Sequence, residues 1–174
     1  MPRRPGHRAL AALTCALLAG TGLACGDGDE AASCGPITVE PQDPNQGHLL
    51  AGAESPTFRT DPPTSGPHIA GLIVSGELDR TPTGLEQVST LETGAVIIQY
   101  RDPDDRGALR PLAADHVVVA PDPELDSAVI ATGWVRSMRC DGVDTAALEH
   151  FVETVGGVYD AHAEGTGAST TTGG

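Results

Sequence analysis

The chain of 174 residues contains no lysine, so arginine supplies all of its permanent positive charge. Three of its ten arginines lie within residues 1–24, whereas all 24 acidic residues follow that segment. Residues 25–174 therefore carry seven arginines against 24 acidic side chains, which is a formal net charge of −17. Such a surface repels nucleic-acid phosphates and anionic lipid head groups. We expect no nucleic-acid partner, and the charge is typical of a solvated, exported protein.

The sequence also lacks the short motifs that accompany common enzyme chemistry. It has no Gly-x-Ser-x-Gly turn, no glycine-rich phosphate loop and no His-Glu-x-x-His. Ser65 precedes a histidine by three residues, but in a proline-rich turn its hydroxyl is expected to bond the backbone. Residues 102–107 resemble a calcium loop, yet Ala113 stands where a bidentate glutamate is needed, so we interpret them as a turn. These absences predict a protein that is not an enzyme.

Cysteine is scarce, and there is no Cys-x-x-Cys pair. Cys15 lies in the N-terminal apolar segment and Cys25 directly after it, which leaves Cys34 and Cys140 for the folded part. In an oxidising compartment, a Cys34–Cys140 disulfide is the default expectation. Two free thiols, or a soft-metal site with a histidine, are the alternatives.

Residues 1–24 have the pattern of a removable export signal. Arg3, Arg4 and Arg8 precede an apolar run at residues 9–19 that is too short for a stop-transfer helix. Gly-Leu-Ala before Cys25 resembles a bacterial lipoprotein cleavage site, with Cys25 as the lipid-modified residue; an ordinary secretory signal is the alternative. We expect a cell-envelope location with the membrane bound through lipid.

The rest of the chain divides by composition into three parts. Residues 25–33 are small and acidic, as in a flexible tether, and residues 34–159 are long enough for one globular domain. The last segment, residues 160–174, is rich in glycine and threonine and is predicted to be disordered.

Within the domain, short apolar runs separated by Pro- and Gly-rich segments predict a small central sheet. Residues 37–40 read as a short edge strand and residues 45–67 as loop, with regular structure resuming at the apolar run 72–74. Residues 95–100, 116–120 and 128–135 are expected to be strands, and residues 108–115 a short helix. A helix capped by Asp144 and ended by Gly156 and Gly157 should follow. The fold class is α+β, or small α/β, in one domain with a C-terminal helix.

The most distinctive stretch is Pro-Pro-Thr-Ser-Gly-Pro-His at residues 62–68, a loop whose three prolines fix its backbone. His48 precedes it, and Val-Ser-Thr-Leu-Glu-Thr-Gly at residues 88–94 leads into the apolar run that follows. In this order the segments resemble the domain of unknown function 3105 family of small exported bacterial domains, over residues 47–156. Typical members read Val-His-x-Leu-Glu-His-Gly in the last segment, so Ser89 and Thr93 replace two family histidines.

The resemblance implies a partly lost histidine site at which His48, His68 and Glu92 remain. Imidazole is the commonest protein ligand for zinc and copper, whereas Glu92 either orients a ligand or caps the entry to the strand. Without the resemblance, both histidines would be structural residues that hold their loops together. Two functions follow: a non-enzymatic, envelope-anchored interaction or scaffold module with an unknown protein partner, or an extracytoplasmic domain that binds a copper or zinc ion through His48 and His68.

Overall fold

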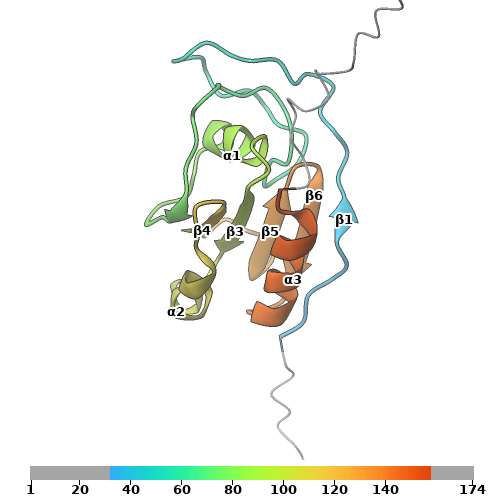
Figure 1. The fold of residues 1–174 in the computed structure, drawn as a ribbon, viewed down its shortest axis with the longest axis vertical. Coiled ribbons are helices and arrows are strands. Elements are labelled where there is room, and N and C mark those ends of the chain that lie inside the picture. Colours follow the sequence, from blue (N-terminus) through green and yellow to red (C-terminus); the bar gives the residue numbers. More distant parts are fainter. Residues whose placement is uncertain (1–31, 158–174) are drawn as a thin grey trace, which may run out of the picture. The chain divides into compact units, whose positions relative to one another are not determined.

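The computed structural model describes residues 32–157. Six strands form one mixed sheet in the order β1-β6-β5-β3-β4-β2 (Figure 1). The strand β3 pairs parallel with β4, which pairs parallel with β2, and the remaining neighbours are antiparallel. Along the chain the elements are β1 (Thr38–Val39), β2 (Gly76–Glu77), α1 (Gly84–Leu91), β3 (Val96–Tyr100), the 3₁₀ turn η1 (Pro103–Asp105), α2 (Arg106–Leu109), η2 (Arg110–Leu112), β4 (Val117–Pro121), β5 (Val129–Gly133), β6 (Arg136–Cys140) and α3 (Thr145–Val155).

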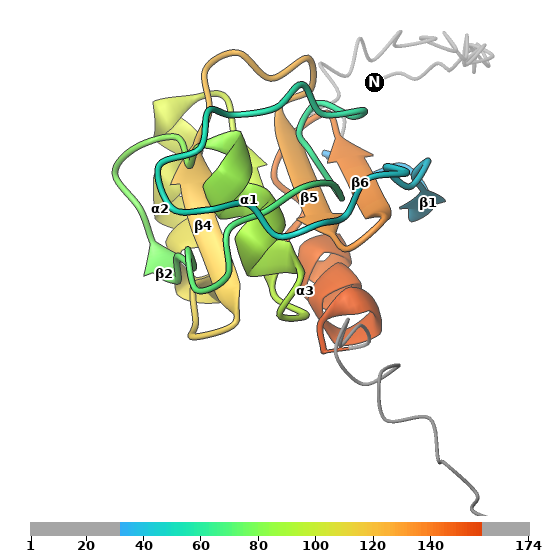
Figure 2. The same cartoon turned by 90° about the horizontal axis from the view of Figure 1, so that it is seen from above.

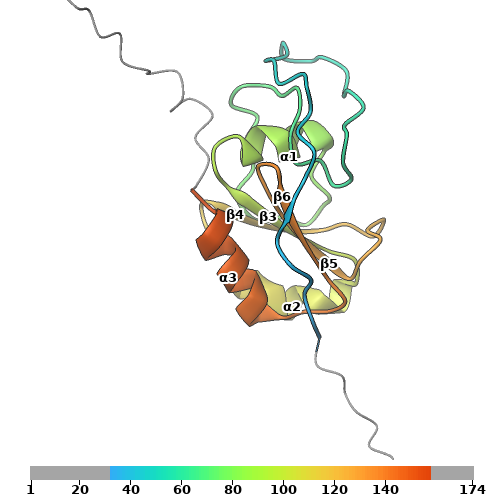
Figure 3. The ribbon, with the colours of Figure 1, turned by 90° about the vertical axis from the view of Figure 1, so that its right-hand side faces the viewer.

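The helices cover both faces of the sheet, because successive side chains of a strand point to opposite sides. Ile98 of β3 packs in a core cluster with Leu109 of α2 and Phe151 of α3. The adjacent Ile97 points the other way, into a cluster with Leu91 of α1. Figure 3 shows the result: α1 lies on one side of the sheet, and α2 and α3 lie on the other. This confirms the predicted α+β domain with a central sheet and a C-terminal helix.

The long connection between β1 and β2 passes over α1, as Figure 2 shows in blue to green. Hydroxyls of α1 hold it there: Ser89 Oγ accepts the backbone N–H of Ile69 at 3.1 Å, and Thr90 Oγ1 accepts that of Val74 at 3.1 Å. Residues 62–68 are all buried. The predicted loop is therefore a packed layer above the helix.

Four expectations about individual elements are wrong. Residues 88–94, which the sequence marked only as the entry to a strand, contain the end of a helix, because α1 begins at Gly84 and runs to Leu91. Residues 72–74 form no strand, and β2 begins at Gly76 instead. The predicted turn at residues 102–107 and the predicted helix at residues 108–115 instead form one helical segment between β3 and β4, which starts at Pro103 and ends at Leu112.

The fourth correction concerns the third predicted strand. It ends at Gly133, and the chain reverses at Trp134 and Val135 into β6, which sequence reasoning did not predict. No glycine or asparagine marks this two-residue turn, although Val135 takes a positive φ of 49°. A β-branched residue rarely adopts that conformation, so the usual signal for a hairpin is missing.

A disulfide joins Cys34 and Cys140, in agreement with the sequence expectation. It ties the segment before β1 to the end of β6, next to hydrogen bonds between Ser33 and Asp141. For a loop of this length the chain-entropy model assigns up to roughly 4.7 kcal/mol of stabilisation. No helix in residues 32–157 is both long and apolar enough to cross a bilayer. The predicted signal, Cys25, most of the tether and the C-terminal tail lie outside the described residues.

Candidate metal site

The proline-rich segment places His68 against the C-terminal end of α1, next to Glu92, and its conformation depends on Gly66. This glycine has φ 143°, and a Cβ there would lie 3.0 Å from the ring of Phe58. A Cβ at Gly84, the first residue of α1, would lie 2.4 Å from the same ring. Phe58 therefore packs against two glycine backbones and joins the loop to the start of the helix.

His48 and His68 are brought together by backbone pairing. The two residues form an isolated parallel bridge, in which Leu49 N–H donates to His68 O at 2.7 Å and His68 N–H donates to Gly47 O at 3.3 Å. Their imidazole rings stand edge to face, with centroids 4.7 Å apart. The pairing fixes both histidines on one side of the loop.

Glu92, the C-cap residue of α1, completes the cluster from the helix. Its Oε2 lies 2.7 Å from His68 Nε2, and its Oε1 lies 3.6 Å from His48 Nε2. One ligand atom from each of the three residues lies within 4.8 Å of the other two. The structure thus brings together all three residues that the sequence nominated for a metal.

The two nitrogens of His68 have different environments. Nδ1 lies 3.0 Å from the carbonyl oxygen of Gly66, which can only accept, so Nδ1 carries a proton and donates. In the neutral ring, Nε2 then carries a lone pair that faces the Glu92 carboxylate. Although the two atoms are 2.7 Å apart, their alignment is not that of a hydrogen bond, and Nε2 is buried without a hydrogen-bond partner. Two electron-rich atoms this close repel each other unless a hydrogen on Nε2 links them or a metal ion beside them accepts both as ligands.

The donor set fits a first-row transition metal. Around a zinc ion with bonds of about 2.0–2.1 Å, tetrahedral ligand atoms lie about 3.4 Å apart. The separation of 3.6 Å between His48 Nε2 and Glu92 Oε1 is close to that value, whereas the contact of 2.7 Å between His68 Nε2 and Glu92 Oε2 would have to widen to admit an ion. The Gly66 carbonyl acts as the outer partner that usually orients a ligating histidine.

Trp134 forms a wall of the site that sequence reasoning missed. Its ring is perpendicular to that of His68, with centroids 6.3 Å apart, and it is 4% exposed. The strained turn that carries it is held by two backbone hydrogen bonds, from Val135 N–H to Thr64 O and from Glu40 N–H to Val135 O. The only sequence signal was that Trp134 is the sole tryptophan.

The residues that replace the family histidines make other contacts. Ser89 is buried and its hydroxyl accepts the Ile69 N–H, directly beside His68. Thr93 is exposed and its hydroxyl donates to the carbonyl of Thr90 at 2.7 Å. Of the remaining residues considered from the sequence, Ser65 accepts the Asp43 N–H through its hydroxyl, as expected.

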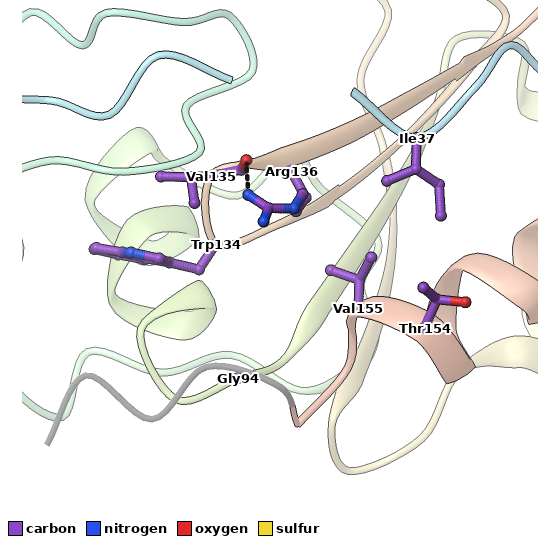
Figure 4. A pocket seen from close by; sticks show the side chains of 7 residues that line it. All are labelled: Ile37, Gly94, Trp134, Val135, Arg136, Thr154 and Val155. Carbon is purple, nitrogen blue, oxygen red and sulfur yellow. Dashed lines mark hydrogen bonds between the residues drawn. The ribbon is translucent and has the colours of Figure 1, made fainter. Parts of the chain in front are cut away.

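A separate apolar cavity of about 300 Å³ lies between the β5–β6 turn and the end of α3 (Figure 4). Trp134 and Val135 line it, together with Val155 and the backbone of Gly94. None of the three metal-donor candidates belongs to this cavity, so it is distinct from the histidine cluster.

The comparison with family models finds one match, to the family described as protein of unknown function (DUF3105), over residues 51–170. The chain belongs to this family. The DUF3105 description supplies no activity, so membership confirms the resemblance without adding a function. No curated protein and no solved structure matches the chain.

Proposed function

We propose that the protein binds a copper or zinc ion through His48, His68 and Glu92 and that it acts as a metal-binding module, not as an enzyme. The observation that carries the proposal is the buried Nε2 of His68, which faces a carboxylate at 2.7 Å without a hydrogen bond. A metal ion would relieve this contact by accepting both atoms as ligands. The Gly66 carbonyl supports the proposal because it selects the tautomer in which Nε2 is free to ligate.

The test is a titration of the tag-free, metal-free protein with Zn²⁺ and with Cu²⁺ by calorimetry. We expect binding of one ion per chain by the wild type. His68→Ala should weaken binding at least tenfold, which corresponds to about 1.4 kcal/mol. Glu92→Gln, which keeps the shape of the side chain and removes its charge, should also weaken binding.

His150→Ala is the matched control, because His150 is an exposed histidine on α3 outside the cluster. Its binding should equal that of the wild type, and circular dichroism should show that every variant is folded. Trp134 adds a second readout, since a bound Cu²⁺ ion close to His68 should quench the only indole of the chain. Absence of binding by the wild type, or equal binding by His68→Ala, would refute the proposal and favour an interaction module without metal.

For the location, we propose an exported, lipid-anchored protein of the cell envelope. The support is the sequence pattern that precedes Cys25, together with the disulfide between Cys34 and Cys140, a bond typical of oxidising compartments.

A further inference from the structure

We propose that a metal ion at this site keeps at least one coordination position open to solvent, and that this position binds small monodentate anions. The inference rests on the proposed function. It adds a ligand class, because an ion with an exchangeable position can bind a second molecule, whereas a closed structural site cannot.

The first argument is the number of donors. In residues 32–157, the cluster that can hold a metal consists of three residues, one short of the four ligands of a closed structural zinc site. The hydroxyls at the two positions of the missing family histidines are engaged elsewhere. Ser89 Oγ accepts the Ile69 N–H, and Thr93 Oγ1 donates to the Thr90 carbonyl.

The second argument is the uneven burial of the donors. The side chain of His68 is 2% exposed and that of Glu92 is 10% exposed, whereas that of His48 is 52% exposed. Trp134 closes the buried side and offers no ligand atom, because the indole nitrogen only donates. An ion bound by these residues would therefore meet water on the side of His48.

The third argument is charge. Two neutral imidazoles and one carboxylate leave a divalent ion with a net charge of about +1, so an anion at the open position is favoured over a neutral ligand. The chain as a whole has a formal charge of −14, which repels large polyanions such as nucleic acids. A small anion can approach the ion closely while carrying little charge past the acidic surface.

The experiment uses the full-length protein loaded with Co²⁺, a visible-light reporter for zinc-type sites, and titrated with azide. We expect ligand-field bands on Co²⁺ binding, and a saturable change of these bands with azide that excess chloride reverses by competition. His150→Ala should reproduce both steps. Ser89→Ala should also do so, which would show that the Ser89 hydroxyl is not a ligand.

Two results would overturn the inference while leaving metal binding intact. The first is a Co²⁺ spectrum that azide does not change. The second is a spectrum that becomes azide-sensitive only in His162→Ala, which would mean that a histidine beyond the described residues closes the site. If no ligand-field bands form at all, the proposed function itself has failed. The presence of the bands therefore tests metal binding, and their response to azide tests the open position.

Discussion

His68 differs from the other histidines of residues 32–157 in how its two nitrogens are used. His116 and His150 are exposed, and His48 is half exposed, whereas His68 is buried and has Nδ1 committed to a backbone carbonyl. When one nitrogen of a buried imidazole is held by a hydrogen bond, the other nitrogen can bind a metal without a change in the orientation of the ring. The residue-scale case for a site is therefore strongest at His68 and weakest at His48, which would lose more conformational freedom on binding.

The two positions that lack the family histidines should respond differently if histidine is restored. Thr93 is exposed and lies one helical turn beyond Ser89, so Thr93→His can place an imidazole near Glu92 with little cost to packing. We expect this variant to bind Zn²⁺ or Cu²⁺ at least tenfold more tightly by calorimetry, about 1.4 kcal/mol. Thr145→His, at an exposed position on α3, is the control and should leave the affinity unchanged. An unchanged affinity in Thr93→His would show that this position does not face the ion.

Ser89→His should instead destabilise the fold. Ser89 is 2% exposed, and its hydroxyl satisfies the Ile69 N–H next to His68. The larger ring would crowd a packed interior and leave that donor unpaired, at a combined cost of roughly 2–4 kcal/mol. The double replacement that the family pattern suggests is thus expected to gain affinity through position 93 and to lose stability through position 89.

The site residues themselves were predictable only through the family pattern. His48, His68 and Glu92 are far apart in sequence and form no spacing motif, so residue chemistry alone would have treated the histidines as structural. The Gly66 carbonyl and Trp134 were not predictable, because backbone orientation and tertiary packing decide both contacts.

At the scale of elements, helix α1 positions Glu92, one of the three site residues, and its N-terminal cap is a capping box. Thr83 Oγ1 accepts the Glu86 N–H while the Glu86 side chain accepts the Thr83 N–H at 2.8 Å. Leu85, Val88 and Leu91 then repeat at helical spacing on the buried side. These signals are present in the sequence, but the family motif at residues 88–94 overlaps only the end of the helix and does not reveal it. The strand β6 had no comparable signal, since the turn before it contains neither glycine nor asparagine.

We expect the N-terminal cap of α1 to affect the stability of the fold at acid pH. A hydrogen bond from Arg80 is the main cause that lowers the pKa of Glu86 from 4.5 to about 2, with bonds from Thr83 acting in the same direction and burial opposing them. The Glu86 carboxylate therefore stabilises the fold fully above pH 4.5, and this contribution is lost as the pH falls from there toward 2. We expect Glu86→Gln to flatten the dependence of the unfolding free energy on pH in that window, as measured by urea denaturation.

Glu149→Gln, at an exposed position on α3, is the matched control and should keep the dependence of the wild type. In the same assay, Thr83→Ala should lower the unfolding free energy at pH 7 by about 1 kcal/mol, a typical cost for loss of an N-cap. Identical pH curves for the wild type and Glu86→Gln would mean that the Arg80 pair contributes nothing to folding.

At the scale of the whole molecule, the central strands of the sheet were predictable because the sequence marks their apolar runs clearly, whereas the order of the six strands was not predicted. The runs that became β3, β4 and β5 are apolar without alternation, as expected for strands covered on both faces, and all three are central in the sheet. The edge strand β1 lies within the predicted strand at residues 37–40, whereas the other edge strand, β2, has only two residues and was not predicted. Continuous apolar runs therefore made β3, β4 and β5 predictable, and the strands without such a run, β2 and β6, were missed.

The final prediction concerns how the molecule is held in place. Ser33 is bound to Asp141 by two hydrogen bonds, so the folded part begins eight residues after Cys25. Eight residues span at most about 28 Å, so lipid on Cys25 would keep the domain, and with it the His48–His68–Glu92 cluster, close to the bilayer. We expect fatty-acid labelling of the wild type and its loss in Cys25→Ser, with a shift of the protein from the membrane to the soluble fraction. Cys15→Ser changes a cysteine within the predicted signal and should keep the label. An unlabelled wild type in the soluble fraction would instead assign residues 1–24 to an ordinary secretory signal, with Cys25 as an incidental cysteine.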